Sequence, residues 1–144
     1  MTDLLLLCTI AGQRVALPAL RVQSVVEVSD ITPIPGTPPY VTGLTALRSQ
    51  ALTVIDSALA VGLPALRPHD NPRAAVVEVG GYLYALLLDE AEEVCEPLGG
   101  PMPVTGGFGE KWRRVARGMV ETGDQPALLL DIEALIAEPQ TAAA

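Results

Sequence analysis

Aromatic residues make up only 3% of the 144-residue sequence, which also contains just two cysteines and one histidine. Its hydrophobic core must therefore be aliphatic, and apolar residues are plentiful at 49%. Cys8 and Cys95 lie in apolar runs typical of buried strands, so we interpret them as free thiols in a reducing cytosol. A disulfide between them stays open, although two cysteines do not make a disulfide framework. No spacing of Cys or His matches a zinc site.

Basic residues are also scarce, because nine Lys and Arg face seventeen Asp and Glu and leave a net charge of −8. No basic run is longer than Arg113-Arg114. Nucleic acids and anionic membrane surfaces attract proteins through clustered Lys and Arg, so this balance argues against both as partners.

Long hydrophobic runs are absent too. No segment approaches the ~18 uninterrupted apolar residues of a membrane span, so we expect no direct membrane insertion. The apolar N-terminal run from Leu4 to Ala11 follows Asp3 rather than a positive flank, and it has no cleavage site of small residues. We therefore predict a first strand there, not a signal peptide.

Short strands are what the sequence does contain, since thirteen Gly and thirteen Pro interrupt its apolar runs. The stretch 41–62 predicts a strand, a tight turn at Arg48, a returning strand, and a short helix capped by Asp56 and ended by Gly62. Other predicted strands are Leu4–Ile10, Arg14–Leu17, Val22–Val28, Ala74–Val79, Tyr82–Leu88, Val115–Glu121 and Ala127–Leu130, with a helical turn over Glu110–Arg114 and a closing helix over Ile132–Ala137. Pro-rich loops and the acidic segment 89–96 fill most of the remainder.

The two halves of the sequence resemble each other. A shift of 69 positions aligns Gly12 with Gly81, and a shift of 75 aligns Asp56 with Asp131. The same order of elements recurs in approximate units 12–62 and 81–137, although chance identities compete with this interpretation. We predict one mainly β domain of two small five-stranded β-barrels packed together, with short helices including one at the C-terminus.

No set of residues assembles a reaction. His69 is a lone histidine in a Pro-flanked loop without an orienting partner, and the segment 106–111 lacks the spacing of a phosphate loop. The acidic cluster over 89–96 has no pattern of oxygen ligands around it, which favours a solvated face over a cation site. We therefore expect no enzyme, no metal and no cofactor, but a protein that acts by binding.

Five segments in order resemble the CheW family of adaptor proteins from bacterial chemotaxis arrays and related pilus-motility systems. They are G-Q-R-V-A-L-P-A-L-R-V-Q-S-V-V-E-V, I-T-P-I-P-G-T-P-P-Y-V-T-G-L-T-A-L-R-S, L-T-V-I-D-S-A-L, A-A-V-V-E-V-G-G-Y-L-Y-A-L-L-L-D-E-A-E-E-V and A-L-L-L-D-I-E-A-L-I. The resemblance spans about residues 4–137 and implies two five-stranded barrels without enzymatic activity. It also implies a cytoplasmic location, with association to membrane receptor arrays through partners.

The resemblance implies two binding surfaces, one for the regulatory domain of the histidine kinase CheA and one for the cytoplasmic signalling tip of chemoreceptors. In the family, the Arg of an N-L-R-G turn lies at the receptor-facing surface and pairs with the Glu of a V-x-E-I strand, which correspond here to Arg48 and Glu27. Ser49 replaces the family's Gly and would be strained by about 1 kcal/mol at positive φ. Val26 and Leu44 are core residues by default and candidates for a groove that takes a receptor helix.

Two alternatives stay open. One is a CheW-like adaptor of a pilus-motility or other kinase pathway, which the sequence does not separate from chemotaxis. The other is a small-ligand-binding β-barrel with an apolar lumen behind the Gly- and Pro-rich loop at 97–109, which requires a lumen larger than five-stranded barrels usually leave.

Overall fold

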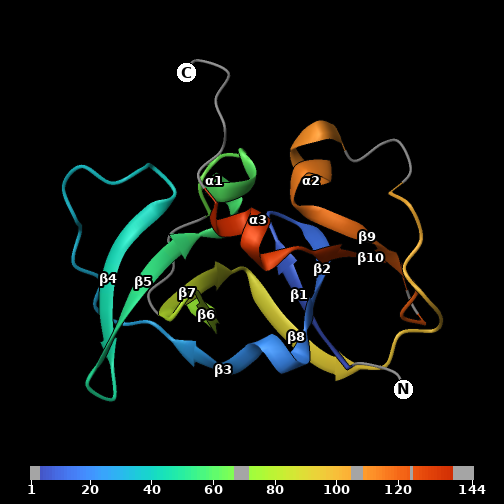
Figure 1. The fold of residues 1–144 in the computed structure, drawn as a ribbon, viewed down its shortest axis with the longest axis horizontal. Coiled ribbons are helices and arrows are strands. Elements are labelled where there is room, and N and C mark those ends of the chain that lie inside the picture. Colours follow the sequence, from blue (N-terminus) through green and yellow to red (C-terminus); the bar gives the residue numbers. More distant parts are fainter. Residues whose placement is uncertain (1–3, 67–71, 105–108, 124, 138–144) are drawn as a thin grey trace.

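Two five-stranded β-sheets packed against each other form the protein, as seen in a computed structural model that describes residues 4–66, 72–104, 109–123 and 125–137 (Figure 1). Sheet A has the strand order β8 (Glu90–Cys95), β1 (Leu5–Ile10), β2 (Gln13–Pro18), β10 (Ala127–Leu130) and β9 (Ala116–Val120). Sheet B has the order β3 (Val22–Glu27), β6 (Arg73–Val79), β7 (Tyr82–Leu88), β5 (Gln50–Asp56) and β4 (Val41–Leu47). The helices are η1 (Ala19–Arg21), α1 (Ser57–Val61), α2 (Gly109–Val115) and α3 (Ile132–Ile136).

The central strands contain long apolar stretches where both of their faces are buried. In β1, Leu5 and Leu7 belong to a small cluster inside sheet A, whereas Cys8 and Ile10 belong to the large cluster shared by both sheets. Successive side chains of a strand point to opposite faces, so a strand between two clusters has no polar side. A third cluster, which includes Leu52, lies inside sheet B.

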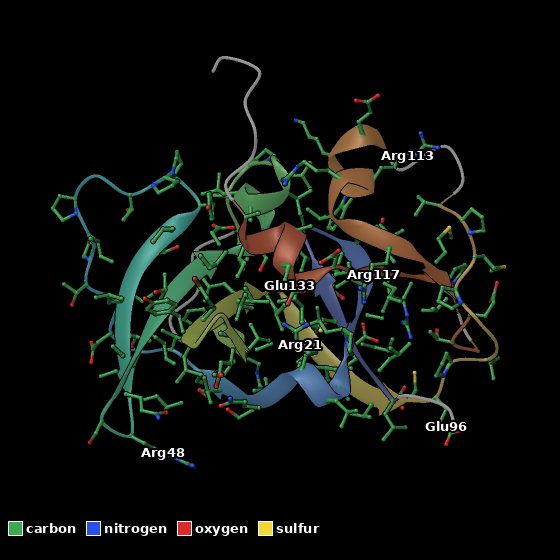
Figure 2. All side chains as sticks on the ribbon, in the orientation of Figure 1. Arg21, Arg48, Glu96, Arg113, Arg117 and Glu133 are labelled. Atoms are coloured by element: carbon green, nitrogen blue, oxygen red, sulfur yellow. The ribbon has the colours of Figure 1, made fainter. Side chains whose placement is uncertain are left out.

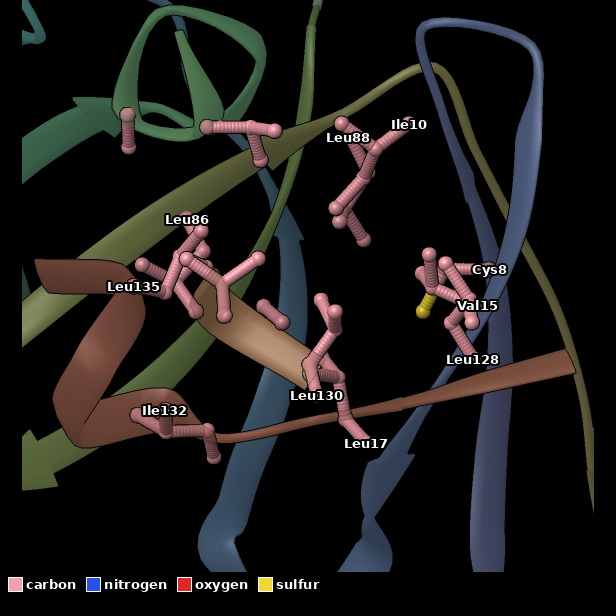
Figure 3. Packing of buried hydrophobic residues seen from close by; sticks show 14 of the residues in the cluster. Cys8, Ile10, Val15, Leu17, Leu86, Leu88, Leu128, Leu130, Ile132 and Leu135 are labelled. Atoms are coloured by element: carbon pink, nitrogen blue, oxygen red, sulfur yellow. The ribbon is translucent and has the colours of Figure 1, made fainter. Parts of the chain in front are cut away.

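The large cluster joins the two sheets and the three α-helices into one core (Figure 3). Leu17 and Leu128 reach it from sheet A, Leu86 from sheet B, and Leu135 from α3. Each of these side chains is less than 2% exposed. Aliphatic residues supply almost all of this core, as the scarcity of aromatic residues predicts.

Arg114 of α2 ties the three helices together at one side of this core. Its guanidinium donates to the carbonyl of Ala60 in α1 and, over 3.5 Å, to the carbonyl of Ala134 in α3. Helix C-terminal carbonyls carry partial negative charge and have no partner within the helix. One cation therefore satisfies two helix ends.

Two local features, an Asp that caps a helix and a glycine that a loop approaches closely, each occur twice, 75 positions apart. Asp56 caps α1, with Oδ1 accepting from the amides of Ala58 and Leu59, and Asp131 caps α3 by accepting from Ala134. Gly43 and Gly118 both lie where a loop crosses a strand, since an added Cβ would come within 2.3 Å of the Thr32 carbonyl oxygen and 2.7 Å of the Met102 carbonyl oxygen. The division into units 12–62 and 81–137 stays a prediction.

The sheets do not follow this division. Sheet A joins the hairpin β1–β2 to β8, β9 and β10, and sheet B joins the hairpin β6–β7 to β3, β4 and β5. Parallel ladders (β2 with β10 and β5 with β7) and antiparallel ladders (β1 with β8 and β3 with β6) make these connections. Each sheet therefore takes strands from both halves of the chain, a non-local pairing that leaves no periodic signal in a sequence. Closure of either sheet into a barrel remains a prediction.

The predicted strands and helices are confirmed with small shifts of their ends. The acidic segment 89–96, for which the sequence favoured a solvated face without assigning a strand, contains β8. Its carboxylates fit an edge strand, because charges at a sheet edge oppose pairing with other chains. No helix in the described ranges is long and apolar enough to cross a bilayer.

Candidate functional site

The β4–β5 hairpin presents Arg48 at its tip. Leu47 and Gln50 are cross-strand partners, so Arg48 and Ser49 alone make the turn, with φ values of 51° and 71°. Two positive φ values in a two-residue loop are those of a type I′ turn, whose twist matches that of the flanking strands. Arg48 projects from the end of the hairpin, away from both sheets (Figure 2). The expected turn is thus confirmed, and Ser49 does occupy positive φ.

One face of β4 continues the exposed surface of this tip. Leu44 and Ala46 precede Arg48 at two-residue intervals, and all three are exposed, with Leu44 at 38%. Residues two apart share a face of a strand, so Leu44 and Ala46 lie on one face of β4, and together with Arg48 at the tip we call them the hairpin strip. Leu44 therefore lies where a partner can contact it.

A backbone bridge holds the hairpin strip in place. Thr32 donates its amide to the carbonyl of Leu44 over 2.8 Å and accepts from the amide of Leu44 over 2.9 Å. Gly43 has no side chain, which lets the Thr32 backbone approach this closely. The loop before β4 thus fastens the strand that carries the strip.

Glu27 ends β3 and is exposed, while Val26 points inward and packs against the cluster inside sheet B. Directly opposite Glu27 in the ladder is Arg73 of β6. The ion pairs of the described residues do not join Glu27 to Arg48, and β3 and β4 are the two edge strands of sheet B. The Arg48–Glu27 pairing implied by the family resemblance therefore stays a prediction.

Val25 is a surface residue, although the sequence suggested a core residue by default and it was not chosen among the predicted contact residues. It is 36% exposed and lies on the same face of β3 as Glu27, whereas the predicted contact residue Val26 lies on the other face. Val25 and Val26 are both β-branched, so residue type could not separate the exposed side chain from the packed one.

A second apolar surface surrounds one end of sheet A. We call it the sheet A rim, and its exposed side chains are Leu4, Leu20, Leu98 and Met102, at 45%, 89%, 68% and 43%. Beside them lies a cavity of about 700 Å³ lined by side chains of sheet A, η1 and the loop that follows β8. Clustered exposed apolar residues of this kind mark interaction sites. The small-ligand alternative predicted an apolar space behind this loop.

Two arginines supply the charge of the cavity wall. Arg21 forms a double hydrogen bond with Glu133 of α3, at 3.3 Å and 2.5 Å (Figure 2). This bond lowers the pKa of the Glu133 carboxyl. Arg117 has a looser partner, because its Nε lies 3.9 Å from Oδ2 of Asp131. The two guanidiniums thus differ in how fully carboxylates neutralise them.

The described ranges bear on the metal and thiol chemistry that the sequence left to be tested. No three His, Cys, Asp or Glu side chains there could hold a metal ion. Burial raises the pKa of the Cys8 thiol to about 12, with Glu92 adding to the shift, which makes a poor nucleophile. His69 and residues 105–108 of the glycine-rich segment lie outside the described residues.

The fold and these surfaces define a protein of two packed β-sheets with exposed apolar side chains on both sheets. Residues 4–140 match the family model described as the CheW-like domain, so the chain belongs to the CheW-like family.

Curated relatives and a solved structure agree with this assignment. The chain is 28% identical over 131 residues to a probable chemotaxis protein CheW of Rhizobium etli, covering 87% of this chain and 83% of that protein. It is 27% identical over 130 residues to the chemotaxis protein CheW of Thermotoga maritima, covering 88% and 82%. The crystal structure of the scaffolding protein TtCheW from Thermoanaerobacter tengcongensis has the same fold, with a TM-score of 0.80, 24% identity, and coverage of 98% and 97%.

Proposed function

We propose that this protein is a non-enzymatic, cytoplasmic scaffold of chemotaxis that couples chemoreceptor signalling tips to a CheA-type histidine kinase. Membership of the CheW-like family and the names of its relatives support this class of function. The scaffold would hold receptor and kinase in one array, which raises their effective concentration and biases the conformational equilibrium of the kinase.

The observation that carries the proposal is the presence of two separate surfaces on different sheets. The hairpin strip lies at one end of the molecule, and the loop of the sheet A rim lies at the opposite end of its long axis (Figure 1). An adaptor needs two sites that two partners can occupy together, and this spacing lets both bind without collision.

We assign the hairpin strip, with Arg48, Ser49 and Leu44, to the receptor. The receptor surface would extend toward Glu27 at the end of β3, with Val26 supporting that strand from within. A guanidinium at a fixed turn is preorganised for a carboxylate, and arginine is common among residues that dominate binding energy. The exposed Leu44 adds apolar contact for a receptor helix.

We assign the sheet A rim to the regulatory domain of the kinase. Four exposed apolar side chains around a hollow fit a protein partner that removes them from water. Glycine residues in the neighbouring loop leave backbone, not side chains, at part of this surface.

The first experiment is a calorimetric titration of the purified protein with the regulatory domain of the CheA-type kinase from the same organism. Saturable one-to-one binding at about micromolar affinity or tighter supports the adaptor function. Leu98→Glu should weaken it at least tenfold, an effect of about 1.4 kcal/mol. Absence of binding to the wild-type protein would refute the kinase assignment.

A receptor titration tests the hairpin strip independently. Arg48→Glu should weaken receptor-tip binding while kinase binding and the unfolding midpoint stay unchanged, because Arg48 is exposed at a turn. Arg113→Glu is the matched control, since Arg113 is an exposed arginine of α2. Equal receptor affinity in both variants would remove Arg48 from the site.

A CheW-like adaptor of a pilus-motility or other kinase pathway uses the same surfaces. The same titrations against the kinase and receptor proteins of each pathway distinguish the two functions. The pathway whose kinase binds more tightly is the one that this protein serves.

A further inference from the structure

The cavity in the sheet A rim has the size and lining of a small-molecule site. Its volume of about 700 Å³ falls within the roughly 300–1,000 Å³ that such sites occupy. Leu5, Val120 and Leu129 give it an apolar wall that continues into the cluster inside sheet A. Gly99 and Gly100 leave another wall open, because a Cβ on either residue would meet nothing within 4 Å.

The charged side chains that line this cavity are both arginines. Arg21 already gives two hydrogen bonds to the carboxylate of Glu133. Arg117 is 62% exposed, and its one ion-pair partner in the described ranges is Asp131, at 3.9 Å. The other carboxylate oxygen of Asp131 caps α3 through the amide of Ala134. Arg117 thus retains donors for an outside anion, and hydrogen bonds between two charged groups are among the strongest.

We infer that this cavity binds a small apolar anion, of which a medium-chain carboxylate is the simplest example. The hydrocarbon tail lies along Leu5, Val120 and Leu129, and the carboxylate accepts hydrogen bonds from Arg117. Burial of the tail drives binding, and the guanidinium sets the orientation of the ligand. This site goes beyond the proposed adaptor function, and a bound ligand would occupy part of the rim that we assign to the kinase.

Octanoate is the probe for this site, titrated into the isotope-labelled protein and followed by the methyl signals of Leu and Val in NMR spectra. The expected result is saturable one-to-one binding with the largest shifts at Leu5, Val120 and Leu129. Octan-1-ol has the same tail without the charge, and it should bind at least tenfold more weakly. Shifts that grow without saturation, or that spread over all exposed methyl groups, would overturn the inference.

Variants separate the two parts of the site. Arg117→Gln should weaken octanoate binding by about tenfold while leaving octan-1-ol unchanged, since it removes only the charged donor. Arg113→Gln, the control, should leave both affinities unchanged, because Arg113 does not line the cavity. Leu20→Glu places a carboxylate at the mouth without disturbing the fold, since Leu20 is 89% exposed, and it should also weaken octanoate. Octanoate binding that neither variant changes would refute the site.

The octanoate titration tests the cavity independently of the proposed adaptor function. If the kinase domain binds but octanoate does not, the cavity serves only an apolar side chain of a protein, and the small-anion inference fails. If octanoate binds but no kinase domain does, the inference stands and the kinase assignment fails. If both bind, octanoate should compete with the kinase domain for the rim.

Discussion

Replacement of Gly43 by alanine tests how the backbone around the hairpin strip is held. A Cβ at this position would come within 2.3 Å of the carbonyl oxygen of Thr32 and 2.9 Å of a side-chain carbon of Ile31. The φ of Gly43 is 155°, so an L-residue would also be strained there. Because a carbonyl oxygen cannot yield like the end of a flexible side chain, the loop before β4 must move away from the strand.

The expected loss of stability follows from the contacts that this movement breaks. Two backbone hydrogen bonds between Thr32 and Leu44, at 2.8 and 2.9 Å, would be lost, at about 0.5–1.5 kcal/mol each. Backbone strain adds roughly 1 kcal/mol. We expect Gly43→Ala to lower the free energy of unfolding by about 3 kcal/mol, or the melting temperature by roughly 10 °C.

Urea denaturation followed by circular dichroism measures this loss, with two variants for comparison. Gly118→Ala should also lower stability, by the close approach alone, because its Cβ would come within 2.7 Å of the carbonyl oxygen of Met102. Gly100→Ala should change stability by less than about 0.5 kcal/mol, since a Cβ there meets nothing within 4 Å. If Gly43→Ala is as stable as Gly100→Ala, the close approach of Thr32 does not hold the hairpin.

Three further predictions follow from the turn, the helix junction and the buried thiol. Ser49→Gly should raise the free energy of unfolding by roughly 0.5–1 kcal/mol in urea titrations, because glycine relieves the φ of 71°; the same change at Ser24, in the extended strand β3, should lower it. Arg114→Ala should lower the free energy of unfolding by roughly 1–2 kcal/mol in thermal denaturation, because two helix-end carbonyls lose their donor. Arg114→Lys should recover only part of this lost stability, and a lysine variant as stable as the wild-type protein would contradict the bridging role. With its pKa at about 12, Cys8 stays protonated at pH 8, so a thiol reagent should label it only after denaturant is added, and labelling at the rate of a free thiol in the native protein would contradict its burial.

Local chemistry made much of the fold predictable from sequence. The carboxylate of Asp56 was expected to cap a helix and Gly62 to end it, and the structure has both, with Gly62 at a φ of 108°. The turn at Arg48 was also expected, since two apolar runs separated by a short polar segment favour a hairpin. These features depend on residues within a few positions of one another.

Features that depend on distant segments were not predicted. The strand β8 was missed because its three acidic residues hide the strand pattern, and its pairing with β1 is a contact between remote parts of the chain. The packing of Val26 and the exposure of Val25 depend on which side of β3 meets the core. For the cavity at the sheet A rim, the sequence predicted an apolar space behind the loop at 97–109 but not its other walls, because these come from strands at both ends of the sequence.

Each sheet contains a hairpin from the opposite half of the chain, which links the two ends of the molecule. Each sheet is held together by strands from both halves of the chain, because β1–β2 and β6–β7 each belong to the sheet made otherwise by the opposite half. Local opening of one sheet is then costly, and the protein should unfold in a single step. A conformational change at the hairpin strip on sheet B can therefore reach the sheet A rim in two ways. One is the packing between the sheets, and the other is the chain that passes from one sheet to the other.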